Sequence, residues 1–170
     1  CSPARLRKAV EITYADIGIA SDMEQSIKDL GYSGYQGEYP EVTIVFAPDR
    51  PPLDVIQNEA VDFVYSSHSL EHSPNPIAAL ADYIRVVKPG GVVYTIIPNK
   101  RFTYDRESKV TPAQVLINKY HADIWTYTLD EYKDVFFGTT DHEVYRGKTM
   151  QDVEDAWKSE SIHHKGHHHI

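Results

Sequence analysis

Short apolar runs alternate with polar clusters between residues 61 and 105, and this pattern predicts a strand, a helix and a second strand. Residues 61–65 are apolar and rich in β-branched and aromatic side chains, which favours a buried strand. Residues 92–97 predict a second buried strand for the same reason. Apolar residues at helical spacing lie between the two runs, and we expect this helix face to pack on the sheet. These residues are Ile77, Leu80, Ile84 and Val87.

Both ends of the predicted helix carry recognisable signals. Asn75 has the side chain of a helix N-cap, and Pro76 suits the first helical position. The helix is expected to stop at residues 88–91, Lys-Pro-Gly-Gly, where a cation meets the negative helix end and glycines can adopt positive φ. The sequence therefore predicts two parallel strands joined by a right-handed crossover.

Polar residues follow each of the two strands. The first cluster begins with Ser66, Ser67 and His68 and runs to His72, and the second is the loop at residues 98–106. The carboxyl ends of neighbouring parallel strands meet at one edge of the sheet, where open α/β sheets bind their ligands. We therefore expect both clusters to face the same crevice.

The loop after the second strand is dense in hydrogen-bond donors. Lys100, Arg101 and Arg106 can bind a phosphate, a carboxylate or a sugar acid. The alternative is that these cations pair with Asp105 and Glu107 at the protein surface.

The first fifty residues predict two further strands, at residues 11–17 and 41–46. A capping-box pattern between them predicts a helix at residues 22–30, and a glycine- and tyrosine-rich loop follows at residues 31–40. Asp16 lies near the end of the first of these strands, where it either accepts hydrogen bonds from ribose hydroxyls or opens a turn.

The C-terminal third predicts a helical cap over the sheet. Thr111 and Pro112 predict the start of a helix that runs to about residue 121, with Thr111 as the N-cap. Residues 123–147 are rich in aromatic side chains, and we interpret them as an inserted lid. A last helix is expected at residues 149–159. Its apolar face consists of Met150, Val153 and Trp157.

Composition narrows the classes of function. The chain has 170 residues and a formal net charge of −8, which disfavours a nucleic-acid partner. No apolar run is long enough to span a bilayer, so we expect no membrane partner and a cytoplasmic location. The single cysteine, Cys1, agrees with a reducing compartment. Nothing in the sequence predicts the oligomeric state.

The histidines near the end of the chain, in the stretch SIHHKGHHHI, have three interpretations. They are a purification tag, native sequence or metal ligands. We predict no metal site, because a closed geometry needs carboxylate or cysteine partners that the sequence does not specify.

The order strand, S-S-H-S-L-E-H, helix, R-V-V-K-P-G-G, strand, I-P-N resembles the middle of a class I S-adenosylmethionine-dependent methyltransferase of the methyltransferase-11 type. The loop at residues 98–106, followed by Thr111 and Pro112, resembles a subgroup with a P-D-K-R-Y-x-F-D loop that is associated with surface-glycan gene sets; Asn99 replaces its aspartate. The resemblance implies a Rossmann-like, mainly parallel α/β sheet with flanking helices. It implies a partial cofactor-binding core at residues 1–110 and a helical cap at residues 111–170.

The resemblance also implies an incomplete fold. The family's first strand and glycine-rich turn fall before or at Cys1, and its last strands fall beyond Ile170. We therefore expect an internal portion of a longer protein or a degenerate form.

S-adenosylmethionine is the implied cofactor. The resemblance assigns Asp16 to the ribose hydroxyls and Asp49 or its neighbours to adenine, although a solvated turn carboxylate is an equal interpretation of Asp49. The full set of implied cofactor contacts is Ser2, Asp16, Ile17, Asp49, Ser66, Ser67 and His68.

The expected reaction is methyl transfer to a hydroxyl or amine of a small acidic or sugar-containing acceptor, with a role in surface-glycan biosynthesis. Such a transfer depends mainly on alignment, and a hydroxyl acceptor also has to lose its proton. Histidine titrates near neutrality and can take that proton. The candidates, in order, are His72, His142 and His121, and the implied acceptor contacts are Asn99, Lys100 and Arg101.

Two other classes of protein compete with this prediction. A non-catalytic methyltransferase-like module would bind a partner or glycan through the aromatic segment. A nicotinamide-dependent sugar-nucleotide enzyme shares the nucleotide fold but uses a Tyr-x-x-x-Lys pair. Tyr83 and Val87 occupy that spacing here, which counts against the second alternative.

Overall fold

The computed structural model describes residues 15–16, 44–45, 49–103, 106–138, 149–159 and 168. The chain forms two compact units, Cys1–Ala47 and Pro48–Ile170. The helix expected at residues 22–30 and the loop expected at residues 31–40 lie outside the described residues.

The first unit contains a parallel pair of short strands. β1 (Ala15–Asp16) pairs with β2 (Ile44–Val45), and Asp16 lies opposite Val45. Both strands fall inside the segments where the sequence predicts strands, so the prediction of a strand at each place is confirmed.

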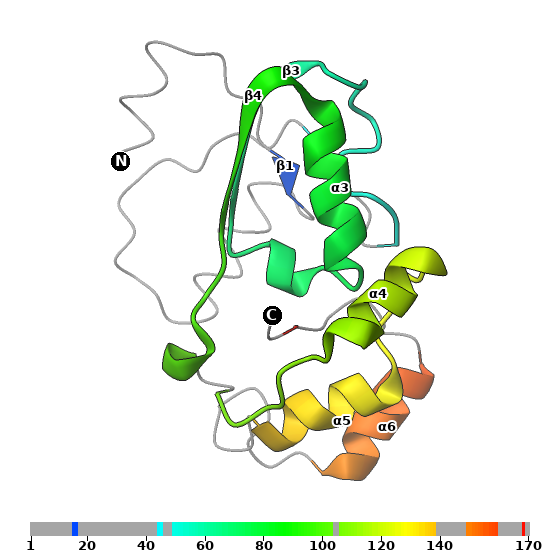
Figure 1. The fold of residues 1–170 in the computed structure, drawn as a ribbon. Coiled ribbons are helices and arrows are strands. Elements are labelled where there is room, and N and C mark those ends of the chain that lie inside the picture. Colours follow the sequence, from blue (N-terminus) through cyan, green and yellow to red (C-terminus); the bar gives the residue numbers. More distant parts are fainter. Residues whose placement is uncertain are drawn as a thin grey trace, which may run out of the picture. The chain divides into compact units, whose positions relative to one another are not determined.

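The second unit is built around a strand, a helix and a parallel strand. β3 (Val61–Ser67) leads through α3 (Pro76–Val86) to β4 (Val87–Ile96), and β3 and β4 pair in parallel (Figure 1). The unit that the apolar pattern predicts is therefore confirmed.

The start of α3 is the one that the sequence predicts. The Asn75 side chain accepts a hydrogen bond from the backbone N–H of Ala78 at 3.2 Å, and Pro76 is the first helical residue. Asn75 is fully buried, and its amide donates to the backbone oxygen of Lys119 at 3.1 Å. One side chain thus caps α3 and ties it to a later helix.

The end of α3 differs from the prediction. The helix ends at Val86, and Val87 is already extended because it pairs with Val61. Residues 88–91 then form an irregularity inside β4. Val61 pairs with Val87 and Phe63 with Val92, so β4 advances five residues while β3 advances two. Gly90 has φ of +84°, as expected for glycine, and a Cβ on Gly91 would collide with the backbone oxygen of Asp62.

The helix face that packs inward differs from the one predicted, of which only Val87, here part of β4, is buried. Ala79, Tyr83 and Val86 are buried, whereas Leu80 and Ile84 are 37% and 60% exposed. The buried face includes Asp82, whose carboxylate accepts the backbone N–H of Leu53 at 2.7 Å. Polar partners from the preceding loop therefore allow this face to be buried, which apolar spacing alone does not indicate.

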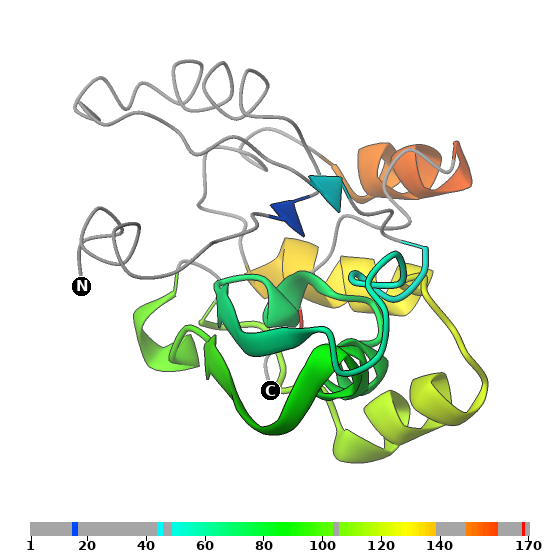
Figure 2. The same cartoon turned by 90° about the horizontal axis from the view of Figure 1, so that it is seen from above.

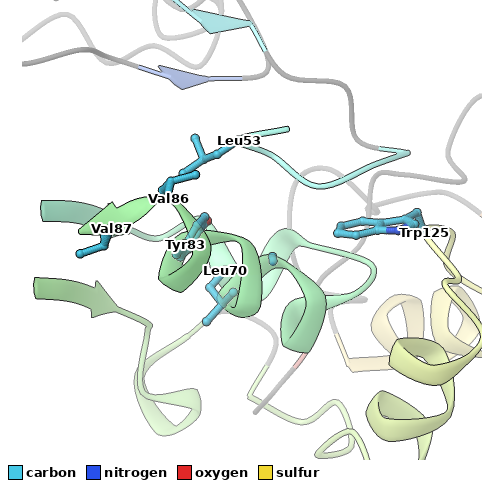
Figure 3. Close-up of a cluster of buried hydrophobic side chains, with 7 residues drawn as sticks. Leu53, Leu70, Tyr83, Val86, Val87 and Trp125 are labelled. Atoms are coloured by element: carbon cyan, nitrogen blue, oxygen red, sulfur yellow. The ribbon is translucent and has the colours of Figure 1, made fainter. Parts of the chain in front are cut away.

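A hydrophobic cluster joins α3 to the sheet and to the loops on either side. Figure 3 labels six of its side chains on β4, α3 and the neighbouring segments. The buried members are Leu53, Leu70, Ala79, Tyr83, Val86, Val87 and Trp125.

The two strands are buried on one face only, which corrects the expectation of fully buried strands. Val64 and Val93 pack against the cluster. On the opposite face Tyr65 and Tyr94 are 59% and 57% exposed, and their rings stack at 5.6 Å between centroids. Alternate residues of a strand point to opposite faces, and an apolar run does not reveal that one face stays open.

Three helices follow the sheet. They are α4 (Ala113–His121), α5 (Leu129–Gly138) and α6 (Met150–Lys158). α4 contacts α3 (Figure 2), and α5 contacts α6. None of the described helices combines the length and apolar character needed to cross a bilayer.

The cap of α4 corrects the sequence prediction, and α6 lies where a helix is expected at residues 149–159. Pro112, not Thr111, occupies the N-cap of α4, because the extended backbone continues one residue further. Thr149 caps α6 in a reciprocal capping box with Asp152. The expected apolar face of α6 is also confirmed, since Val153 lies in a second buried cluster. That cluster contains Tyr127, Tyr132 and Val153, with Met150 and Trp157 packed against it.

Candidate functional site

The carboxyl ends of β3 and β4 lie at the same edge of the sheet. Ser66 lies opposite Thr95 and Ser67 opposite Ile96 in the parallel register. The backbone N–H of His68 extends this pairing by donating to the Ile96 oxygen at 2.9 Å. The two polar clusters that follow these strands therefore start from one edge, as the sequence predicts.

Hydroxyl groups lie close to this edge. Ser66 is buried beside the Tyr83 hydroxyl, and Thr95 Oγ1 has no hydrogen-bond partner within the described residues. Ser67 is exposed, and its backbone oxygen accepts a hydrogen bond from Ser69 at 3.2 Å. Buried polar atoms without partners are uncommon, and they mark places where a ligand or water completes the bonding.

His68 stands at the end of β3 in an unusual backbone conformation. Its φ is +53°, a region that residues other than glycine seldom adopt. Its side chain is 61% exposed, and Nδ1 lies 3.6 Å from Oε1 of Glu71. Strained residues of this kind cluster at functional sites, where the surrounding structure holds them in place.

The short 3₁₀ helix η1 (Leu70–His72) follows His68 and carries a buried carboxylate. Glu71 is only 2% exposed, and its Oε2 has no hydrogen-bond partner among the described residues. Sequence reasoning placed Glu71 in the polar cluster without giving it a role. The signal that was available is its spacing, three residues after a histidine at a strand end.

Two of the three histidines predicted to be catalytic lie in the described residues. His72 ends η1 and is exposed. His121 is the last residue of α4, also exposed, with its ring 5.5 Å from that of Tyr120. His142 lies outside the described residues. Their catalytic roles remain predictions.

The loop after β4 forms the 3₁₀ helix η2 (Lys100–Phe102). Asn99 caps it by accepting a hydrogen bond from the backbone N–H of Arg101 at 3.1 Å. Lys100 Nζ donates to the backbone oxygen of Arg106, whose own guanidinium lies 3.4 Å from Glu107. Arg106 therefore follows the surface-pairing alternative, whereas Arg101 remains exposed beside the strand edge as a candidate contact.

The structure places only two of the other residues implied as cofactor contacts, Asp16 and Asp49. Asp16 closes β1, and Asp49 is exposed with the Arg50 side chain 3.4 Å away, as in the solvated-turn interpretation. Ser2 and Ile17 lie outside the described residues.

His168 lies inside the fold, which the tag interpretation of the terminal histidines does not predict. It is 1% exposed, and its backbone N–H donates to the Glu71 oxygen at 2.7 Å. Its ring nitrogens lie 3.1 Å from Thr111 Oγ1 and 3.3 Å from the Pro74 oxygen. The Tyr127 ring packs against it, with centroids 4.9 Å apart. The buried His168 thereby anchors the backbone of Glu71 through this hydrogen bond.

Three buried groups near this segment have shifted pKa values. Burial raises the pKa of Tyr127 well above its ordinary value, and nearby Tyr132, Glu131 and Glu71 act in the same direction. Burial likewise raises the pKa of Tyr83. Burial lowers the pKa of Lys119, although Glu131 partly restores it.

We expect the free energy of unfolding to fall as the pH rises above about 10, the ordinary tyrosine pKa. The unfolded chain then releases tyrosine protons that folded Tyr127 and Tyr83 retain, and each retained proton costs about 1.4 kcal/mol per pH unit. Lys119 acts in the opposite direction, but one group does not offset two. Urea unfolding between about pH 9 and 11 measures the slope. The Tyr127→Phe variant should show a shallower fall, and an equal slope in both proteins would contradict this account.

No metal site is present in the part of the chain that the structure describes, where no three His, Cys, Asp or Glu side chains come together. The groups at the strand edge are serine hydroxyls, the Thr95 hydroxyl and the exposed imidazole of His68.

Comparison with known families agrees with this arrangement. The family model described as a methyltransferase domain matches residues 7–139, which include both strand pairs, α3 and the strand-end clusters. Neither the curated proteins nor the solved structures gave a match. The parallel sheet with flanking helices fits an incomplete Rossmann-like α/β fold of this family. With more than half of its residues matched, the chain belongs to the methyltransferase-domain family.

Proposed function

We propose that this protein transfers a methyl group from S-adenosylmethionine to a hydroxyl or amine of a small acidic or sugar-containing acceptor, in surface-glycan biosynthesis. The observation that carries the methyl-transfer part is the family match over residues 7–139. The common edge of β3 and β4, with hydrogen-bonding groups on both following segments, supports a ligand site there.

The chain's own residues would bind and orient the reactants. Ser66, Ser67 and His68 would line the cofactor at the end of β3, and Asp16 would accept hydrogen bonds from the ribose. Asn99, Lys100 and Arg101 would contact the acceptor, because cations beside a strand edge attract a carboxylate. The cofactor would supply an electrophilic methyl group. Alignment of the acceptor with that group would account for much of the reduction in the activation barrier.

Calorimetric titration of the chain with S-adenosylmethionine tests the proposal. We expect saturable binding by the wild-type protein. Asp16→Ala should weaken the affinity about 10- to 100-fold, because a hydrogen bond to a charged group contributes about 1.5–3 kcal/mol.

Asp62→Ala is the matched control. Asp62 is an exposed carboxylate near the opposite, amino end of β3, so its removal should leave the affinity unchanged. Absence of binding to the wild-type chain would reject the enzyme and favour a non-catalytic methyltransferase-like binding module.

A further inference from the structure

Glu71 is a buried carboxylate that lies at ion-pair distance from the imidazole of His68. Its side chain is 2% exposed, Oε1 lies 3.6 Å from His68 Nδ1, and Oε2 has no hydrogen-bond partner there. Burying a carboxylate costs several kcal/mol unless it is paired. Nδ1 is the ring nitrogen of His68 that faces this carboxylate.

The backbone holds both residues of this pair in place. His68 is tied to Ile96 by its N–H and adopts φ of +53°. The backbone oxygen of Glu71 accepts hydrogen bonds from the His168 N–H at 2.7 Å and from the Tyr127 hydroxyl at 3.5 Å. Hydrogen bonds to other segments therefore fix the backbone on both sides of the contact.

The two side chains differ in exposure, so only one of them can meet a ligand from solvent. Glu71 is enclosed, whereas His68 is 61% exposed at the ligand edge of the sheet. The two ring nitrogens lie on different edges of the imidazole, so the contact of Nδ1 with Glu71 leaves Nε2 on the edge away from the carboxylate. A histidine whose Nδ1–H is held by a carboxylate presents an unprotonated Nε2 that can accept a proton.

We propose that His68 is the proton acceptor of the methyl-transfer reaction and that Glu71 is its positioning residue. This inference rests on the proposed function. A lone pair of the acceptor oxygen or nitrogen forms the bond to the methyl carbon. The carbon–sulfur bond breaks, and its electron pair goes to sulfur. The acceptor proton goes to Nε2 of His68, and the Glu71 carboxylate stabilises the resulting imidazolium.

Nitrogen NMR of the histidine rings in the full chain tests the pair without any substrate. The signal that disappears in His68→Gln identifies His68. We expect the neutral His68 ring of the wild-type protein to carry its proton mainly on Nδ1. In Glu71→Gln the Nδ1–H share should fall at least about threefold, because a neutral amide binds that N–H less strongly than a carboxylate does.

Glu107→Gln is the matched control, since Glu107 is an exposed carboxylate on a different loop. It should leave the His68 tautomer unchanged. The titratable groups around the pair are Tyr83, Tyr127, His72 and His168, so spectra are compared at one pH where all variants are folded. If Glu71→Gln does not fold, the tautomer of His68 in the wild-type protein still tests the inference.

A wild-type His68 that carries its proton on Nε2, or an equal tautomer share in wild type and Glu71→Gln, would overturn the inference. Calorimetry with S-adenosylmethionine separates this failure from failure of the proposed function. Saturable cofactor binding together with the wrong tautomer rejects only the roles of His68 and Glu71. Absence of cofactor binding rejects the methyltransferase proposal, and with it the use of the pair in methyl transfer.

Discussion

Replacing Arg85 with methionine is expected to lower the free energy of unfolding by about 3–5 kcal/mol, the typical cost of breaking a buried ion pair. The Arg85 guanidinium lies 2.7 Å from the carboxylate of Asp82, which is almost fully buried on α3. It also donates to the backbone oxygens of Leu53 and Ile56, each at 2.8 Å. Loss of the cation leaves a buried charge and two carbonyl groups without their partner.

Lys88→Met is the control for this prediction. Lys88 lies 2.9 Å from Asp62, but both side chains are exposed, so the pair contributes less than about 1 kcal/mol. Urea unfolding of the two variants under the same conditions measures both effects. A loss in Arg85→Met no larger than that in Lys88→Met would show that burial of Asp82 does not matter to stability.

The second large effect is expected at Glu131. Its carboxylate accepts hydrogen bonds from the buried Lys119 ammonium at 2.9 Å and from the backbone N–H of Thr128 at 2.6 Å. Glu131→Gln removes the counter-charge while keeping an oxygen for Thr128. We expect the free energy of unfolding to fall by about 3 kcal/mol, the lower end of the range for a broken buried pair.

A double-mutant cycle isolates the charge interaction. Lys119→Met combined with Glu131→Gln removes both charges and keeps similar side-chain volume, so it should recover more than half of the loss. Asp155→Asn is the surface comparison, because Asp155 pairs with Lys158 where both are exposed, and it should change stability by less than about 0.5 kcal/mol. Additive losses in the double variant would contradict a coupled pair.

Local signals in the sequence predicted much of this fold. Asn75 and Pro76 begin α3, an apolar face marks α6, and apolar runs mark β3 and β4. These features depend on residues close in sequence, where side-chain hydrogen bonding and backbone preference act directly. The end of α3 was placed too late because Val87 is recruited into β4 by Val61, a partner far back in the chain.

The candidate site was predicted in its position and only partly in its composition. The parallel order of β3 and β4 made it possible to place Ser66, Ser67 and His68 at the ligand edge. The buried state of Glu71 was not visible, because its enclosure depends on contacts from residues as distant as Tyr127 and His168. The sequence therefore favoured His72, the exposed neighbour, for a role that we now propose for His68.

The sequence alone determined the alternation of strands and helices, the start of α3, and the edge at which polar groups follow parallel strands. The tertiary structure decided which face of α3 is buried, which face of the strands stays open, and which carboxylate lies against His68. These choices depend on long-range partners such as Leu53 for Asp82 and His168 for Glu71. A charge can be buried only where such partners contact it, and the spacing of residues along the chain does not indicate which distant residues will do so.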